Sequence, residues 1–296
     1  MSKKILIVGD VILDRFQYGT ALGISAETPT VVAKEGKFEE FYGGAALVGR
    51  HIEAQGGQPR VLTMAELDKQ MNIVDHVKSP GWKISKKTRC FVDRYKMVQY
   101  DNINEQKHDA DSEKLLLNAI RTLLPFYDTV VVADNRHGVI SKNIAEALVT
   151  NQDHYSYNLY VDSQFSQNEP NHQWYKNCHT MFMNEKEYEW WRNNCLYKRD
   201  NNLQDLEHFM GCNIIVKLGY KGAMVLGSDK EIKYTVPWLT KEIVDTCGAG
   251  DAFMAAYLMN DQNTQFATDY ASWSCSFKGT EVPTKDDYLD WKDENE

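Results

Sequence analysis

The stretch Asp245-Thr246-Cys247-Gly248-Ala249-Gly250-Asp251 joins two unlike segments of the chain. Before it, Ile243 and Val244 form an apolar, strand-like run, and after it the alanine-rich segment 252–259 has the composition of a helix. A Gly-Ala-Gly turn at the start of a helix leaves backbone N–H groups unpaired and lets an anion approach them without a Cβ in the way. The stretch therefore predicts a binding site for a phosphate-like charge.

Asp251 falls in the first turn of that helix, directly beside the predicted anion site. One interpretation is a base that takes a proton from an attacking hydroxyl. The other is a carboxylate that only stabilises the positive end of the helix dipole. The seven residues by themselves favour neither interpretation.

The composition indicates a folded protein with an acidic balance. Of the 296 residues, 43% are hydrophobic and 25% charged, as is typical of a soluble domain. The formal net charge of −9 argues against a general affinity for nucleic acid or anionic lipid. The six cysteines lack zinc-site spacing and are interpreted as reduced thiols. Since no apolar run is long enough for a signal peptide or a membrane span, we expect a cytoplasmic protein with no nucleic-acid or membrane partner.

Short apolar runs alternate with helix patterns along the chain. The predicted strands are 5–8, 59–64, 129–133, 159–161, 180–183 and 214–218. The predicted helices are 44–55, 112–124 and 141–150, the second capped by Asp111 or Ser112 and the third by Ser141. This alternation predicts an α/β fold with a mostly parallel sheet covered by helices. Polar residues that follow the strands should share one rim of that sheet, namely Gly9 with Asp10, Asp134, Asp162, Asn184 and Gly219.

Two segments, 30–42 and 82–100, break this pattern. They mix β-branched and aromatic residues with charges and lack a helical period, which is typical of an exposed sheet with one wet face. We expect them to pair into a small lid or a dimer surface beside the main domain. The acidic end, 286–296, is interpreted as a solvated tail.

Taken in order, six motifs resemble the ribokinase-like (PfkB) carbohydrate kinases over nearly the whole chain. The motifs are 7–19, 24–29 (Ile-Ser-Ala-Glu-Thr-Pro), 43–46 (Gly-Gly-Ala-Ala), Asn184 with Glu187, 218–222 (Leu-Gly-Tyr-Lys-Gly) and 245–251. The opening segment through Pro29 is similar to the heptose 7-phosphate kinase branch of the ADP-heptose pathway. The resemblance implies a single ribokinase-like three-layer sandwich. Its core would comprise 1–12, 43–81 and 101–296, and its small β-sheet lid 13–42 and 82–100.

The resemblance also implies a role for each matched residue. Asp251 is similar to the family's catalytic base, with Gly248, Ala249 and Gly250 forming the anion site. The implied nucleotide-binding residues are Asn184, Lys217, Gly219, Gly222 and Thr246. Glu187, with Asn184, is implied to organise Mg²⁺ through its water molecules. The implied substrate-binding residues are Asp10, Asp14, Arg15, Gly43, Gly44 and Asp245, and we further expect Arg15, Arg89 and Arg94 to hold a substrate phosphate.

Several of these residues also have simpler interpretations. Asn184 and Glu187 have the spacing of a helix cap and its third-position partner. Gly43-Gly44 is also compatible with an ordinary loop before a helix. Asp14 beside Arg15 is compatible with a surface ion pair.

The sequence departs from the family pattern at positions that concern the substrate. Leu47 stands where the family usually has Asn, and Lys217 stands where a small hydroxyl residue is common. Two cationic positions are lost in the segments 134–138 and 162–164, with Arg136 the nearest replacement. The segment between Met64 and Trp82 is also shorter than in the family.

From the resemblance we expect an ATP-dependent, Mg²⁺-requiring kinase of a sugar phosphate, which acts on O1 of D-glycero-D-manno-heptose 7-phosphate and forms a homodimer through the lid. Two alternatives stay open: a kinase of another sugar or nucleoside, and a regulator of the same fold that binds nucleotide or sugar without turnover. A dinucleotide-binding fold and a P-loop are not supported, because the chain has neither glycine motif.

Overall fold

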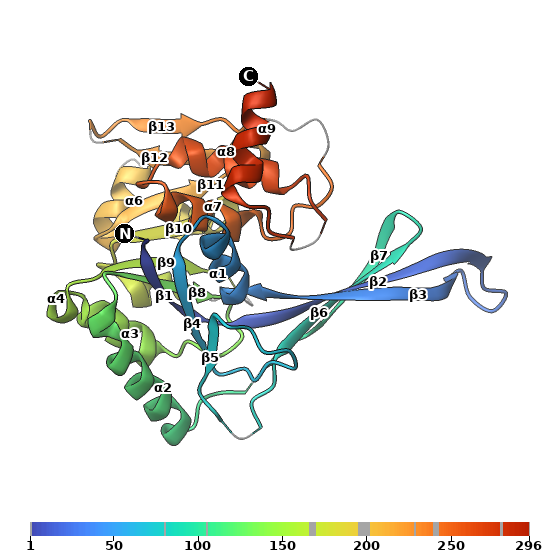
Figure 1. Ribbon diagram of the computed structural model, residues 1–296, viewed down its shortest axis with the longest axis horizontal. Helices are drawn as coiled ribbons and strands as arrows, with labels where there is room; N and C mark the ends of the chain where they lie inside the picture. The colour runs from blue at the N-terminus through green and yellow to red at the C-terminus, as the bar shows by residue number, and fades with distance from the viewer. Residues whose placement is uncertain are drawn as a thin grey trace.

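Alternating strands and helices build a nine-stranded sheet in the computed structural model (Figure 1). The structure describes residues 2–79, 81–104, 106–165, 170–194, 202–227, 229–238, 243–278 and 281–295. The strands of the large sheet, from one edge to the other, are β13 (Ile232–Thr235), β12 (Ala223–Leu226), β11 (Asn213–Lys217), β10 (Thr180–Asn184), β9 (Asn158–Ser163), β8 (Thr129–Asp134), β1 (Lys4–Gly9), β4 (Gln58–Thr63) and β5 (Val74–His76). Only the β11–β12 and β12–β13 pairs are antiparallel among the pairs described in this sheet.

Helices cover both faces of this sheet because successive buried residues of each strand point to opposite sides. Leu6 and Val8 pack in one apolar cluster with α2 (Ala110–Leu123), α3 (Lys142–Thr150), α5 (Glu185–Asn194) and α6 (Leu203–Met210). Ile5 and Ile7 pack on the other face with α1 (Ala45–Ala54), α7 (Ala249–Met259), α8 (Thr264–Ser274) and α9 (Lys285–Asn295). Shorter helical turns are α4 (Gln152–Tyr155), η1 (Leu124–Phe126), η2 (His172–Tyr175) and η3 (Gly219–Lys221). The predicted α/β class and the three layers are confirmed.

The predicted rim is confirmed as well. Strands β1, β8, β9, β10 and β11 are parallel neighbours, so their carboxyl ends lie at one edge of the sheet. The register aligns Gly9 with Ala133 and Ala133 with Asp162, and further along it aligns Asn184 with Lys217. Residues that are 29 to 124 positions apart in sequence are thereby brought together.

A second sheet of four strands projects from the core as a long arm (Figure 1). Its strands, in spatial order, are β3 (Val31–Gly44), β2 (Val11–Ile24), β6 (Ser85–Val92) and β7 (Tyr95–Asn102). The two segments expected to pair with each other do not do so directly, since β2 lies between β3 and β6. The base of β2 is buried against the core, whereas its outer half is exposed. The arm is therefore anchored at the strand ends that adjoin the rim.

Three local predictions were wrong. Ile243 and Val244 are not part of a strand, and the backbone N–H of Val244 instead donates to the carbonyl of Cys275 at 2.8 Å. Helix α2 is capped by Asp109, whose carboxylate accepts the N–H of Ser112 at 2.7 Å. The acidic end is no solvated tail, because α9 buries Tyr288 completely in the core.

The remaining structural features concern cysteines and membrane spans. Cys90, Cys178, Cys212, Cys247 and Cys275 are free thiols, and Cys195 lies outside the described residues. Within the described part of the chain, every helix falls short of the length and apolar character that crossing a membrane requires.

Candidate active site at the carboxyl rim of the sheet

The glycine turn caps α7 in a conformation that favours glycine. Gly248 has φ +80°, and a Cβ at this position would lie 2.5 Å from Cδ2 of Leu47. The turn is closed by the N–H of Cys247, which donates to the Asp245 carboxylate at 3.0 Å. Among the described residues, no acceptor is found for the backbone N–H groups of Gly250 and Asp251. These free donors at a helix start are what an anion site requires.

Asp251 lies in the first turn of α7, among other charged side chains. Burial raises its pKa to about 7, and the nearby Asp162 acts in the same direction, while Lys217 partly opposes them. A carboxylate with such a pKa accepts a proton efficiently near neutral pH. The environment of Asp251 therefore favours its interpretation as a general base over its interpretation as a carboxylate that only stabilises the helix dipole.

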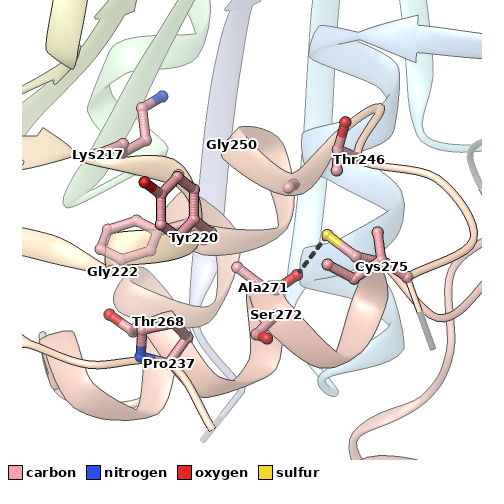
Figure 2. Close-up of a pocket in the computed structure, with 14 residues that line it drawn as sticks. Lys217, Tyr220, Gly222, Pro237, Thr246, Gly250, Thr268, Ala271, Ser272 and Cys275 are labelled. Carbon is pink, nitrogen blue, oxygen red and sulfur yellow. Dashed lines mark hydrogen bonds between the residues drawn. The ribbon is translucent and has the colours of Figure 1, made fainter. Parts of the chain in front are cut away.

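A largely apolar cavity of about 240 Å³ lies on one side of the glycine turn (Figure 2). Lys217, Gly250 and Thr246 lie toward one end of it, and Pro237, Thr268 and Ser272 toward the other. Gly219, Tyr220, Gly222 and Phe253 also line it. Of the residues expected to bind nucleotide, the structure thus brings together Lys217, Gly219, Gly222 and Thr246. An apolar pocket that ends at an anion site suits a ligand with a flat apolar part and a phosphate part.

A larger cavity of about 610 Å³ lies on the other side of the turn, against the small sheet. Ile243 and Thr246 line both cavities, so the segment that leads into the turn separates them. The larger cavity is polar and contains four cationic side chains, Arg89, Arg94, Lys96 and Lys278. Neither Arg94 nor Lys96 forms an ion pair with any residue that the structure describes. Sequence reasoning missed Lys96 and Lys278, since neither belongs to a recognised motif.

Asp14 is buried beside this cavity and forms an ion pair with Arg89, which lines it. Its Oδ1 lies 2.5 Å from Nη1 of Arg89, which also stacks over the ring of Phe16. A Cβ on Gly43 would lie 2.3 Å from Oδ2 of Asp14, so only glycine allows this approach. The alternative of a surface ion pair between Asp14 and Arg15 is wrong, because Asp14 is buried and pairs with Arg89.

Two residues expected to bind substrate point elsewhere. Arg15 follows Asp14 on β2 and so faces the opposite side of the small sheet, where its Nη2 lies 2.5 Å from Glu40. Asp10 is 1% exposed, and its carboxylate accepts the backbone N–H groups of His137 and Val139 at 3.1 and 3.0 Å. Asp10 therefore holds the 137–139 loop at the rim. Gly44, with φ +61°, caps α1 beside it.

Asn184 and Glu187 form a reciprocal capping box at the start of α5. The Asn184 side chain accepts the N–H of Glu187 at 3.0 Å, and the Glu187 carboxylate accepts the N–H groups of Asn184 and Phe165 at 2.7 and 3.1 Å. The helix-cap interpretation is thus confirmed. Burial, with the nearby Asp162, raises the pKa of Glu187 to about 6. The described residues contain no cluster of three His, Cys, Asp or Glu side chains arranged to hold a metal directly.

Comparison with known proteins identifies the family. The model of the pfkB family of carbohydrate kinases matches residues 2–286. The chain belongs to the pfkB family of carbohydrate kinases. The predicted membership of a carbohydrate kinase family is thereby confirmed.

Relatives and solved structures agree with this assignment. The chain is 26% identical over 301 residues to the bifunctional protein HldE of Aliarcobacter butzleri, covering 92% of this chain and 60% of that protein. It is also 26% identical over 265 residues to HldE of Vibrio vulnificus strain YJ016, covering 85% and 54%. The chain thus spans little more than half the length of these curated relatives. Its fold resembles phosphofructokinase-2 of Escherichia coli (TM-score 0.76, 18% identity, 98% of both chains) and ribokinase of Giardia lamblia (TM-score 0.72, 14% identity, 100% of both).

Two of the positions at which this pfkB protein departs from the family pattern, Leu47 and Lys217, lie beside the glycine turn. Leu47 is 2% exposed and packs on Gly248, outside the lining of the cationic cavity. Lys217 forms a short ion pair with Asp162 across the intervening strand β10. Arg136 lies over the ring of Trp174 at 5.4 Å and lines neither of the two cavities. Only Lys217 therefore brings a new charge to the site.

Replacing Asp251 by Asn should lower kcat about 1,000-fold, because the base is lost while the shape is kept. In the unchanged protein, activity should fall as the pH drops below about 7, since protonated Asp251 accepts no proton. Steady-state kinetics from pH 5 to 9 would test both expectations. The matched control is Asp111→Asn, on the exposed first turn of α2. Near-normal activity of the Asp251 variant would exclude Asp251 as the base.

Proposed function

We propose that the protein transfers the γ-phosphoryl group of ATP to a hydroxyl of a phosphorylated sugar. The observation that carries this proposal is the position of the glycine turn between two unlike cavities. The apolar cavity suits the adenosine part of ATP, and the cationic cavity suits an anionic sugar. A phosphoryl group between them would lie at the free N–H groups at the start of α7.

The transfer follows from the groups around that turn. The acceptor hydroxyl oxygen attacks the γ-phosphorus, its proton passes to the Asp251 carboxylate, and the bond from phosphorus to the β–γ bridging oxygen breaks to release ADP. The free backbone N–H groups of Gly250 and Asp251 stabilise the charge on the transferring group. The N–H of Ala249 already donates to the carbonyl of Thr246 at 3.3 Å, and Gly248 supplies the turn that directs the free groups. Asp14 and Asp245 accept hydrogen bonds from sugar hydroxyls and so orient the acceptor.

Mg²⁺ fits the site only through its water shell. The oxygens of Glu187 and Asn184 already accept backbone N–H groups, and Glu187 is 2% exposed. Mg²⁺ retains much of its hydration when nucleotide phosphates supply its other ligands. Asn184, which is exposed at the rim, and Glu187 behind it would hold the ion through water. When bound with ATP, the ion supplies positive charge that neutralises the phosphates.

The acceptor's existing phosphate is assigned to the outer part of the cationic cavity. Arg94 lies in the turn between β6 and β7, Lys96 is the second residue of β7, and Lys278 follows α8 of the core. Lys278 is held by Glu39 at 2.9 Å and lies over the ring of Tyr18 at 4.1 Å. Arg89 is already paired with Asp14. Its role is therefore to position Asp14 for the sugar hydroxyls more than to bind the phosphate. A doubly charged phosphate suits this group of cations.

The leading acceptor is D-glycero-D-manno-heptose 7-phosphate, with O1 as the attacked oxygen and the 1,7-bisphosphate as product. The sequence resemblance of residues 7–29 to heptose 7-phosphate kinases supports this choice. Fructose 6-phosphate is the natural competitor, because phosphofructokinase-2 of Escherichia coli, which shares the fold, has been solved in complex with it.

The first test follows the fate of phosphate directly. Purified protein with ATP and Mg²⁺ should convert the heptose 7-phosphate into a product with a new anomeric phosphate signal in ³¹P NMR. Asp251→Asn serves as the control without the base. Faster transfer to fructose 6-phosphate, ribose or a nucleoside than to the heptose 7-phosphate would show that the acceptor belongs to another class. Binding of ATP with no transfer to any of them would leave only the regulator hypothesis.

Arg94→Gln should raise KM for the sugar phosphate about 10-fold and leave kcat near normal, since a charge-assisted contact to the bound substrate is lost. KM for ATP should not change, because Arg94 lines only the cationic cavity. Initial rates at varied concentrations of each substrate separate the two effects. Arg121→Gln, in the last turn of α2, is the matched control. An equal rise in both KM values would argue against a phosphate contact.

We further propose a homodimer through the small sheet. Its outer half exposes large apolar side chains, including Leu22, Ile24 and Tyr95 at 67%, 67% and 73% exposure. Light scattering should give twice the chain mass of 34.1 kDa, and Leu22→Lys with Ile24→Lys should shift the mass to that of one chain. The control is Leu115→Lys, at an equally apolar exposed site on α2. A single-chain mass for the unchanged protein would contradict the dimer.

A further inference from the structure

Lys217 is the only cation that lines the apolar cavity among the residues that the structure describes. It is the last residue of β11, and its side chain is 17% exposed. Figure 2 shows it at the same end of the cavity as Gly250 and Thr246. Its ammonium group therefore lies where the cavity meets the glycine turn.

The distance to that turn is short. A Cβ placed on Gly250 would lie 3.1 Å from Nζ of Lys217, so the ammonium touches the first turn of α7. One of its three N–H donors is taken by Asp162. For the other two, the described residues offer no hydrogen-bond acceptor. A phosphate oxygen at the free N–H groups of this turn would be within their reach.

The surrounding charges require a cation at this point. Asp162, Glu187 and Asp251 all act on Lys217 electrostatically. Burial lowers the pKa of Lys217, but the ion pair with Asp162 outweighs it and the pKa ends above its ordinary value. The ammonium thus stays charged at neutral pH. Without it, three carboxylates would face an incoming triphosphate with only the helix start to attract it.

We propose that Lys217 is a catalytic residue that binds the transferring γ-phosphoryl group, and that Asp162 is the positioning residue that holds its ammonium against Gly250. This inference rests on the proposed phosphoryl transfer at the glycine turn. The ammonium of Lys217 stays in contact with the γ-phosphoryl group during transfer. The bond from phosphorus to the β–γ bridging oxygen breaks, and the bond from phosphorus to the sugar oxygen forms. Lys217 neither gains nor loses a proton in the step.

The test compares nucleotides as well as rates. Lys217→Met should lower kcat about 100-fold, as loss of a charge-stabilising donor does, with KM for the sugar little changed. By calorimetry with Mg²⁺, its Kd for the β,γ-imido analogue of ATP should rise about 10-fold and that for ADP much less. Lys217→Arg should restore part of both effects. Lys142→Met, in an exposed ion pair on α3, is the matched control.

Two further variants separate binding from structure. Lys217→Met leaves Asp162 unpaired, so Asp162→Asn with Lys217→Met removes both charges and keeps the site neutral. This double variant should lose the preference for the triphosphate as fully as Lys217→Met does. Asp162→Asn alone should weaken the same preference less.

Equal losses of affinity for ADP and the triphosphate analogue would overturn the assignment, and so would an unchanged kcat in a folded Lys217→Met protein. If the unchanged protein phosphorylated no sugar, the proposed function would fail. The ratio of the two nucleotide affinities would still test Lys217.

Discussion

The site depends on the contact between Gly248 and Leu47. Helix α7 is buried along most of its length, and its start must nevertheless reach the rim where the strands end. The left-handed turn at Gly248 redirects the chain into the helix, and Leu47 of α1 lies where any side chain at Gly248 would be. The position of the free N–H groups is thus set by packing between two helices. Charge stabilisation of this kind is effective because the donors do not have to reorganise.

Cationic side chains gather at two places in this acidic protein. The net charge of −9 repels phosphate in general, so attraction must be local. The structure has two such local groups, one in the cationic cavity and one at Lys217. Three of these cations are paired with a carboxylate: Arg89 with Asp14, Lys278 with Glu39 and Lys217 with Asp162. These pairs keep the cations charged and fixed in direction before a ligand arrives.

The small sheet carries both one wall of the cationic cavity and the surface proposed for dimerisation. Its base carries Phe16 and Arg89, which line the cationic cavity, and its outer half carries exposed apolar side chains such as Leu22 and Ile24. Strands β2 and β3 both extend from the base to the outer half, although their pairing shifts register between Gln17 and Gly19 and between Ala21 and Gly23. The same two strands therefore contribute to the cationic cavity and to the proposed dimer surface.

The sequence by itself determined the layers, the rim and the glycine turn. Apolar runs, helix periods and turn residues are properties of neighbouring residues, so β1, β8, α3 and the 245–251 turn could be predicted from short windows. Only the tertiary structure decided which charges meet. Lys217 and Asp162 are 55 positions apart, and Lys278 and Glu39 are 239 apart. The burial of Tyr288 in an acidic helix likewise could not be predicted from the neighbouring residues. Such pairings follow from strand order and helix packing, because these bring distant segments of the chain into contact.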